Sequence, residues 1–290
     1  MELTDDGTTL AVANGDVELF RYVYLPPEPQ VESPRPYLHP VRTLGGEVVS
    51  IYRPDDHVWH KGISWSLPHV GPANFWGGPT FVRDAGYQQL ANNGAMRHHE
   101  FTAREADHVT HTLDWITEQG ELWVTEERTL RVSLVDGGWT LGFTSAMRNV
   151  RGEPIVFGSP TTEGRPNAGY GGLMWRGPRE FSGGKVVLPE NSGGDDLMGA
   201  RAPWLAYQSS STVVFVDAPT NPGHPTKWFV RTQPFACACP APFFDQEVPL
   251  PPGETLTLTY SVVIADGTPN PEALASQVLL GPDGQLLQRG

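Results

Sequence analysis

The chain has 290 residues, of which 32 are glycine and 28 are proline, and this composition excludes an architecture of long helices. Hydrophobic residues make up 39% and aromatic residues 10%, enough apolar material for a large core, so a disordered or collagen-like chain is also excluded. The net charge of −13 repels phosphate backbones and anionic lipids, and we therefore expect neither nucleic acid nor a membrane as a partner.

The sequence also restricts cellular location and covalent cross-links. Residues 1–6 contain neither a basic segment nor an apolar run, and no stretch approaches the ~18 apolar residues of a membrane helix. We therefore predict a cytoplasmic protein. Cys237 and Cys239 are two residues apart, a spacing at which a disulfide between them would be strained, so no disulfide scaffold is expected.

Alternation of apolar and polar residues predicts strands through most of the chain. A short helix is predicted after Asn270, which would cap it. The pattern indicates an all-β fold, a large antiparallel β-sandwich with very little helix. We expect a single domain over residues 1–290, with residues 1–16 as a loosely attached start and residues 270–290 as a short helix and tail. The predicted strands are residues 17–24, 44–51, a three-stranded meander at 108–147, 185–188, 213–217, 227–231 and 254–264.

Histidine is concentrated in one part of the chain, because eight of the nine histidines lie between His39 and His111. His57 and His60 are three residues apart, which places them on opposite faces of a strand but near each other in a turn. The preceding sequence Pro54-Asp55-Asp56 favours a turn. We therefore predict that the two imidazoles are neighbours.

Three interpretations of these histidines remain open. A divalent metal could be bound by His57, His60 and either His39 or His99. Asp56 would then be a further ligand or the hydrogen-bond partner of a ligand. Alternatively, His57 and His60 are general acid and base, with Lys61 stabilising an oxyanion. In the third interpretation they are loop histidines whose hydrogen bonds are satisfied by backbone carbonyls and nearby aspartates.

Aromatic residues surround the histidine segment. A sugar ring has an apolar C–H face that stacks on an indole, and its hydroxyls need charged or amide partners. Tryptophan together with histidine and arginine on loops is therefore typical of a sugar site, and Trp76 is a candidate contact. Alternatively, these aromatic residues fill the core of the sandwich. The aromatic residues concerned are Trp59, Trp65, Phe75, Trp76, Phe81 and Tyr87.

Two later segments are candidates for contact with a ligand. Residues 162–176 mix glycine with polar side chains, as expected where a loop passes close to a ligand, and their spacing does not match a phosphate loop. Tyr170 and Arg176 are binding candidates there, although Arg176 could equally be a structural arginine paired with a carboxylate. Arg231, on a predicted strand, could point at an anionic or polar ligand. Further candidate substrate contacts are His99, Glu163 and Asn167.

Taken together, several short motifs resemble a bacterial family labelled "methane oxygenase PmoA", over roughly residues 35 to 267. That label implies a membrane monooxygenase, which the absence of an apolar span contradicts. The resemblance more usefully implies a β-supersandwich similar to galactose mutarotases and a role in carbohydrate catabolism. The motifs are His39-Pro40-Val41, Asp56-His57-x-x-His60-Lys61-Gly62, Asn74-Phe75-Trp76-Gly77, residues 167–176, residues 225–231 and residues 258–263.

Mutarotase-like enzymes act with a histidine acid and a carboxylate base and without metal, so the resemblance implies no cofactor. By motif position, His57 and His60 would take the imidazole role, and Glu163 and Glu100 are candidates for the carboxylate.

The predicted function is acid–base proton transfer on a sugar or glycoside, either isomerisation or epimerisation or the β-elimination of a keto-sugar. His57, His60 and His39 would be catalytic, and Lys61 and Arg176 would hold developing negative charge. One alternative is a non-catalytic carbohydrate-binding module. Another is a metal-dependent lyase or hydrolase that uses the His39, His57 and His60 cluster. The sequence gives no prediction of oligomeric state.

Overall fold

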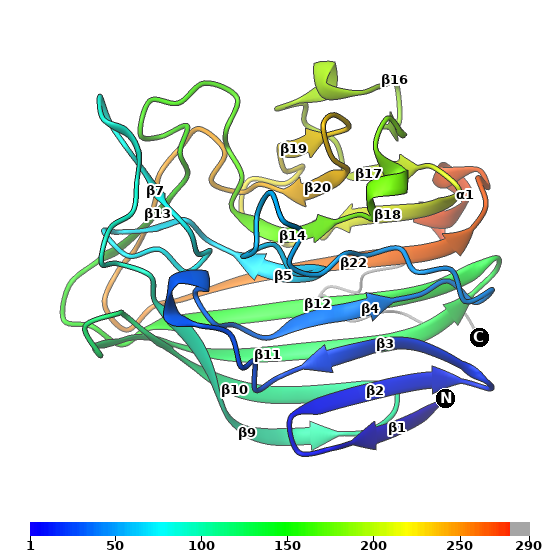
Figure 1. Cartoon of the computed structure of the whole chain (residues 1–290), viewed down its shortest axis with the longest axis horizontal. Helices are drawn as coiled ribbons and strands as arrows, with labels where there is room; N and C mark the ends of the chain where they lie inside the picture. The colour runs from blue at the N-terminus through cyan, green and yellow to red at the C-terminus, as the bar shows by residue number, and fades with distance from the viewer. Residues whose placement is uncertain (279–290) are drawn as a thin grey trace.

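Residues 1–278 are described by a computed structural model in which antiparallel strands dominate (Figure 1). Two large sheets stack on each other, and regular α-helix is limited to one short segment near the end of the described chain. The predicted all-β fold, a large antiparallel sandwich with very little helix, is confirmed. Within residues 1–278, no helix has the length and apolarity needed to cross a membrane.

The elements have the following bounds. The eight-stranded sheet has the order β1 (Glu2–Asp5), β2 (Thr9–Asn14), β3 (Val17–Val23), β4 (Tyr37–Val41), β5 (Ile63–Ser66), β14 (Gly172–Arg176), β20 (Cys237–Pro240), β19 (Trp228–Arg231). The nine-stranded sheet has the order β16 (Ser192–Gly193), β15 (Lys185–Val187), β17 (Trp204–Gln208), β18 (Ser211–Asp217), β22 (Thr255–Asp266), β12 (Gly138–Asn149), β11 (Leu122–Val135), β10 (His108–Ile116), β9 (Ala95–Arg104). Smaller elements are β21 (Val248–Leu250), β13 (Ile155–Gly158) and β6 (His69–Val70) in one sheet, β7 (Thr80–Val82) and β8 (Gly86–Gln88) in another, α1 (Pro271–Ser276), and 3-10 helices at Gln30–Glu32, Arg179–Phe181 and Asp195–Leu197.

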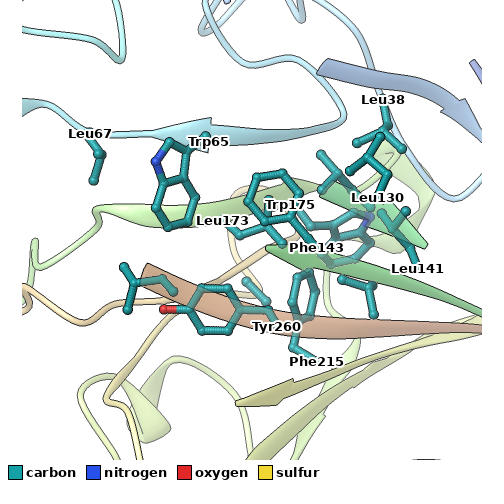
Figure 2. Close-up of a cluster of buried hydrophobic side chains, with 14 of the residues drawn as sticks. Leu38, Trp65, Leu67, Leu130, Leu141, Phe143, Leu173, Trp175, Phe215 and Tyr260 are labelled. Atoms are coloured by element: carbon teal, nitrogen blue, oxygen red, sulfur yellow. The ribbon is translucent and has the colours of Figure 1, made fainter. Parts of the chain in front are cut away.

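The core lies between the two large sheets. Trp65 of β5 packs against Phe143 of β12, with ring centroids 5.5 Å apart, and against Tyr260 of β22 at 6.2 Å (Figure 2). Trp175 of β14 lies in the same cluster, and its indole N–H donates to the carbonyl of Val49. Because each buried indole removes a large apolar area from water, this layer of aromatic rings stabilises the stacking of the sheets.

The predicted meander at residues 108–147 is formed by β10, β11 and β12, which pair in consecutive order. Its apolar alternation is interrupted in β11 because Glu126 and Arg128 also point into the core, where the guanidinium and the carboxylate are 2.8 Å apart. The Nε1 of Trp115 and the hydroxyl of Ser145 donate to the same carboxylate. A buried charge pair with its hydrogen bonds satisfied is thus compatible with a continuous strand.

The structure differs from the sequence-based prediction in two segments and agrees with it in a third. The strand predicted at residues 44–51 is wrong, because this segment turns back at Gly45 and Gly46 and forms only the single bridge between Arg42 and Val48. Residues 1–16 were predicted to be a loosely attached start, but they contribute β1 and β2 to the edge of a sheet. The predicted helix forms as α1, capped by the Asn270 side chain, and the rest of the predicted tail, 279–290, lies outside the described residues.

Candidate functional site

A cavity of 390 Å³ opens on the outer face of the eight-stranded sheet, over β14, β20 and β19. In β14, Trp175 points into the core between the sheets, so Met174 points outward and forms part of the cavity floor. In β19, Val230 points into the core and its neighbours Phe229 and Arg231 point into the cavity. The volume is that of a small-molecule site, which typically measures about 300–1,000 Å³.

One wall of the cavity is a double turn that carries His57 and His60. The N–H of His57 donates to the carbonyl of Pro54, and the N–H of His60 donates to the carbonyl of His57, both at 2.9 Å. The turn brings the imidazoles into a stack with centroids 4.6 Å apart. Gly62 ends the segment at φ 47°, where a Cβ atom would lie 2.0 Å from the Leu38 carbonyl oxygen, so the turn requires glycine there. The sequence-based expectation that the two imidazoles are neighbours holds.

Asp56 orients His57. The carboxylate of Asp56 accepts from Nδ1 of His57 at 3.0 Å and from Nη2 of Arg176 at 2.7 Å. Burial acts to raise the pKa of Asp56, but these two hydrogen bonds outweigh it and hold that pKa below its ordinary value. Because an ionised carboxylate only accepts, Nδ1 of His57 carries the proton, and Nε2 is the nitrogen that remains free for a ligand.

His60 is held in the opposite tautomer. Nη1 of Arg176 lies 2.9 Å from Nδ1 of His60, and since a guanidinium only donates, this Nδ1 accepts and Nε2 carries the proton. Burial first, and then the charges of His57, Arg176 and Arg35, place the pKa of His60 well below its usual value. A buried imidazole of this kind is a fixed neutral donor, which fits the predicted role as a titrating acid–base group poorly.

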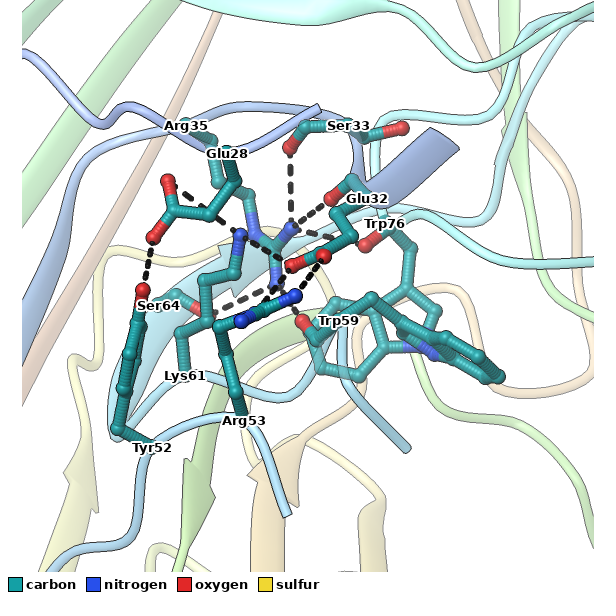
Figure 3. A network of polar contacts seen from close by, with 10 residues as sticks. All are labelled: Glu28, Glu32, Ser33, Arg35, Tyr52, Arg53, Trp59, Lys61, Ser64 and Trp76. Carbon is teal, nitrogen blue, oxygen red and sulfur yellow. Dashed lines mark hydrogen bonds and ion pairs between the residues drawn. The ribbon is translucent and has the colours of Figure 1, made fainter. Parts of the chain in front are cut away.

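Two indoles form the aromatic wall, and buried Arg35 positions them. Its guanidinium donates to the carbonyls of Trp59 and Trp76, both at 2.8 Å, and its Cζ lies 4.6 Å from the centre of the Trp76 ring (Figure 3). Both tryptophans line the cavity, and the Trp76 ring also packs against His60 at 4.7 Å. Gly78 follows this wall at φ 66°, and a Cβ atom there would lie 2.7 Å from the Trp59 ring.

Arg165, Tyr87 and Tyr170 form a further part of the cavity lining. Arg165 donates to the hydroxyl of Tyr87 and its guanidinium lies 4.9 Å from the centre of that ring. The two tyrosine hydroxyls are 2.9 Å apart. Burial, followed by the neighbouring Tyr87, raises the pKa of Tyr170 well above its ordinary value, so its hydroxyl stays protonated and able to hydrogen-bond a ligand.

Arg231 reaches the cavity from β19, as its predicted strand position suggested. Its Nη1 lies 3.4 Å from a carboxylate oxygen of Asp195, and its Nη2 donates to the backbone carbonyl of Asn167 at 3.4 Å. The other oxygen of Asp195 accepts from the backbone N–H and the hydroxyl of Thr232. Asn167 thus meets a cavity residue through its backbone, while its exposed side chain is not part of the lining.

Lys61 does not lie at this cavity. Consecutive residues point in different directions here, and whereas His60 lines the cavity, Lys61 is buried in a separate cluster of charges. Its Nζ lies 3.2 Å from Glu32 and 3.5 Å from Glu28 (Figure 3). Burial, and then the charge of Arg35, lowers its pKa to about 8. The predicted role of Lys61, holding negative charge on the ligand, is not available to it from this position.

Three further predicted site residues also lie elsewhere. Nδ1 of His39 is 2.9 Å from the hydroxyl of Ser50, and burial, followed by Arg42, lowers the pKa of His39 to about 4. His99 is exposed on β9, the edge strand of the other sheet. Glu163 is not among the cavity-lining residues.

The metal alternative required either His39 or His99 to join His57 and His60, and the structure brings neither of them to the cavity. Among residues 1–278, no group of three or more His, Cys, Asp or Glu side chains is arranged to hold a metal ion. Because Nδ1 of His60 accepts from Arg176, Nε2 of that ring carries the proton and has no lone pair free for a metal.

Sequence reasoning missed several lining residues. Phe235 was missed although its ring lies 3.6 Å from the Cζ of Arg176, and so was Arg165. Met174, Phe229 and Cys237 lie on strands, where successive side chains point to opposite faces of the sheet. This alternation could have placed them on the cavity face once the tryptophans that face the core were known. Asp56 was noted only as a possible partner of a metal, whereas the structure places it on His57.

Comparison with known proteins adds a family and several distant resemblances. A model described as "Family of unknown function (DUF6807)" matches residues 9–278. No curated protein matches the sequence.

Three solved structures illustrate the resemblances. A galactose mutarotase-like protein from Lactobacillus casei is 10% identical, with 91% of this chain and 99% of that one covered and a TM-score of 0.44. A putative aldose 1-epimerase from Escherichia coli K12 is 9% identical, with coverages of 91% and 100% and a TM-score of 0.39. Heparan sulfate lyase HepC from Pedobacter heparinus is 8% identical, with 90% of this chain covered and a TM-score of 0.43. The chain spans only 34% of the length of that lyase. Similarity this weak says nothing about what the cavity binds.

Proposed function

The chain belongs to DUF6807, a family of unknown function, and we propose that it binds a sugar or glycoside in the cavity and catalyses proton transfer at a carbon next to a carbonyl. The observation that carries this proposal is the pair of oppositely fixed imidazoles in an aromatic cavity. His57 offers a free Nε2, and His60 offers an Nε2–H that stays in place because Arg176 holds Nδ1. A base and a neutral hydrogen-bond donor are the two groups that enolisation needs.

The aromatic wall supports a sugar as the ligand. Trp59 and Trp76 present indole surface to the cavity, and the apolar C–H face of a sugar ring stacks on such surface. Tyr170 and the two arginines of the lining supply donors for hydroxyl groups.

The reaction steps follow from the tautomers. Nε2 of His57 removes the proton from the carbon next to the carbonyl, and the carboxylate of Asp56 stabilises the imidazolium that forms. Negative charge then develops on the carbonyl oxygen, which accepts a hydrogen bond from Nε2–H of His60, and the charge of Arg176 behind that ring supports it. Return of this proton from His57 to the same carbon, after the enolate has turned its other face toward that imidazole, gives epimerisation. Loss of a substituent from the next carbon, with His57 keeping the proton, gives β-elimination.

Proton exchange in heavy water tests this proposal. Sugars and 3-keto-glycosides would be incubated with the protein in D₂O, and loss of the C–H signal next to the carbonyl followed by NMR. We expect exchange with the native chain and a reduction of about 10²–10⁴-fold in His57→Gln, which loses the base. Asp56→Asn should also slow exchange, because an amide can stabilise the wrong tautomer of His57.

His99→Gln is the matched control, because His99 is exposed on β9 and outside the cavity. It should exchange at the native rate. Equal rates in His57→Gln and His99→Gln would contradict the assignment. Binding of the sugar with no exchange in the native chain would instead favour a non-catalytic carbohydrate-binding protein.

The proposed reaction uses no cofactor. Metal analysis of protein purified without an affinity tag addresses the metal-dependent alternative, and near-stoichiometric metal would favour a metal-dependent lyase or hydrolase over the mechanism above.

A further inference from the structure

The cavity lining is positively charged, although the chain as a whole is negatively charged. The chain has 33 Asp+Glu against 20 Lys+Arg, yet residues 1–278 contribute Arg165 and Arg231 to the lining and no carboxylate. A third arginine, Arg176, lies directly behind His60, where the carboxylate of Asp56 neutralises it. In a partly enclosed site with apolar walls, unbalanced charge acts on a ligand more strongly than in water.

Arg165 is positioned without being neutralised. Its guanidinium lies over the Tyr87 ring and donates to the Tyr87 hydroxyl, which holds its direction. Within residues 1–278 it forms no ion pair with a carboxylate at 4 Å or less. Its full charge is therefore available to a ligand.

Arg231 is only partly neutralised. The nearest carboxylate, that of Asp195, lies 3.4 Å from one of its nitrogens, at the long end of the hydrogen-bond range. Asp195 is engaged more closely by the backbone and hydroxyl of Thr232. The third arginine, Arg176, is by contrast paired with Asp56 at 2.7 Å, and it serves the imidazoles rather than the ligand.

We infer that the cavity selects an anionic sugar, one that carries a carboxylate, phosphate or sulfate group, over the corresponding neutral sugar. This inference rests on the proposed function and adds the class of ligand. Arg165 and Arg231 bind the anionic group, and the guanidinium fork matches the paired oxygens that all three groups share. Trp59 and Trp76 bind the ring.

Calorimetric titration of matched pairs tests the inference. Glucose would be compared with glucuronate and glucose 6-phosphate, galactose with galacturonate, and N-acetylglucosamine with its 6-sulfate, with inorganic sulfate as an anion that has no sugar. We expect at least one charged sugar to bind about 10–100-fold more tightly than its neutral parent, and its affinity to fall as salt is raised. The charged member that binds most tightly identifies which of the three groups the site prefers.

Variants show which residues cause the preference for the charged sugar. Arg165→Gln and Arg231→Gln should each weaken binding of the charged sugar about tenfold or more. Binding of the neutral parent, which loses only a hydrogen bond to a hydroxyl group, should weaken much less. Arg21→Gln removes an equal charge from β3, at an exposed position outside the cavity, and should leave both affinities unchanged. Circular dichroism would show that each variant is folded.

The outcomes separate this inference from the proposed function. Neutral and charged sugars binding equally would overturn the anionic preference and leave the sugar site in place. Binding of inorganic sulfate that depends on Arg165 and Arg231, with no sugar bound, would keep the anion site and overturn the proposed sugar function. Binding of neither class would overturn both.

Discussion

Replacing Arg35 with lysine should destabilise the protein severely even though the charge is kept. Arg35 is fully buried and its guanidinium donates to four backbone carbonyls, those of Glu32, Ser33, Trp59 and Trp76. A lysine ammonium has three donors on one atom, and it cannot span carbonyls that lie on different segments. We expect at least two buried carbonyls to lose their partner, at about 1–3 kcal/mol each, or about 2–6 kcal/mol in total.

Urea denaturation followed by tryptophan fluorescence measures this loss. Arg21→Lys is the control, since Arg21 forms only an exposed pair with Glu18 and should change stability by less than about 1 kcal/mol. Because Trp59 and Trp76 depend on Arg35, sugar binding should also weaken under conditions in which Arg35→Lys is still folded. A stability loss in Arg35→Lys no larger than that in Arg21→Lys would refute the idea that Arg35 positions the aromatic wall.

Three further predictions concern pH, the buried ion pair and the cavity wall. Burial, followed by the charge of Arg128, holds the pKa of His111 well below 6.5 in the folded chain. Below pH ~6.5 the unfolded chain therefore takes up a proton on this residue that the folded chain does not. The free energy of unfolding should fall there by up to about 1.4 kcal/mol per pH unit. Denaturation at pH 7, 6 and 5 should show a shallower slope for His111→Gln, and equal slopes would contradict this. Arg128→Met leaves a buried carboxylate unpaired and should cost about 3–5 kcal/mol in the same assay, and a cost below about 1 kcal/mol would show that the pair is not buried as described. Gly78→Ala should displace Trp59 and weaken sugar binding. Gly86→Ala is the control, because Gly86 has a similar positive φ and a Cβ atom there would have nothing within 4 Å. Equal affinities of the two variants in a titration would count against the aromatic wall as the sugar contact.

The large sheets could be predicted because their strands have one core face and one more polar face. The alternation in β22 and in the β10–β12 meander reads directly from the sequence. Residues 44–51 misled the same reasoning, since valines beside glycines resemble a strand but here form a return loop, in which Val48 is exposed and Val49 is buried. Apolar content alone did not distinguish the two.

The candidate site could be predicted only where it depends on local geometry. The turn that joins His57 and His60 is encoded by the residues just before it, and the expectation held. Lys61 is next to His60 in sequence but lies in another cluster, because the two side chains point in different directions, and a sequence motif does not record direction. Arg165 and Phe235 lie on connections between strands, and no local sequence pattern indicates that these connections reach the cavity.

The most direct test of the central claim is a crystal structure of the protein soaked with the sugar that binds most tightly in the titrations. We predict density for the ring against Trp59 and Trp76, with a substrate carbon or hydroxyl next to Nε2 of His57 and an oxygen within hydrogen-bond distance of Nε2 of His60. Density in a different hollow, such as the one lined by Tyr24 and His98, with this cavity left empty, would contradict the account.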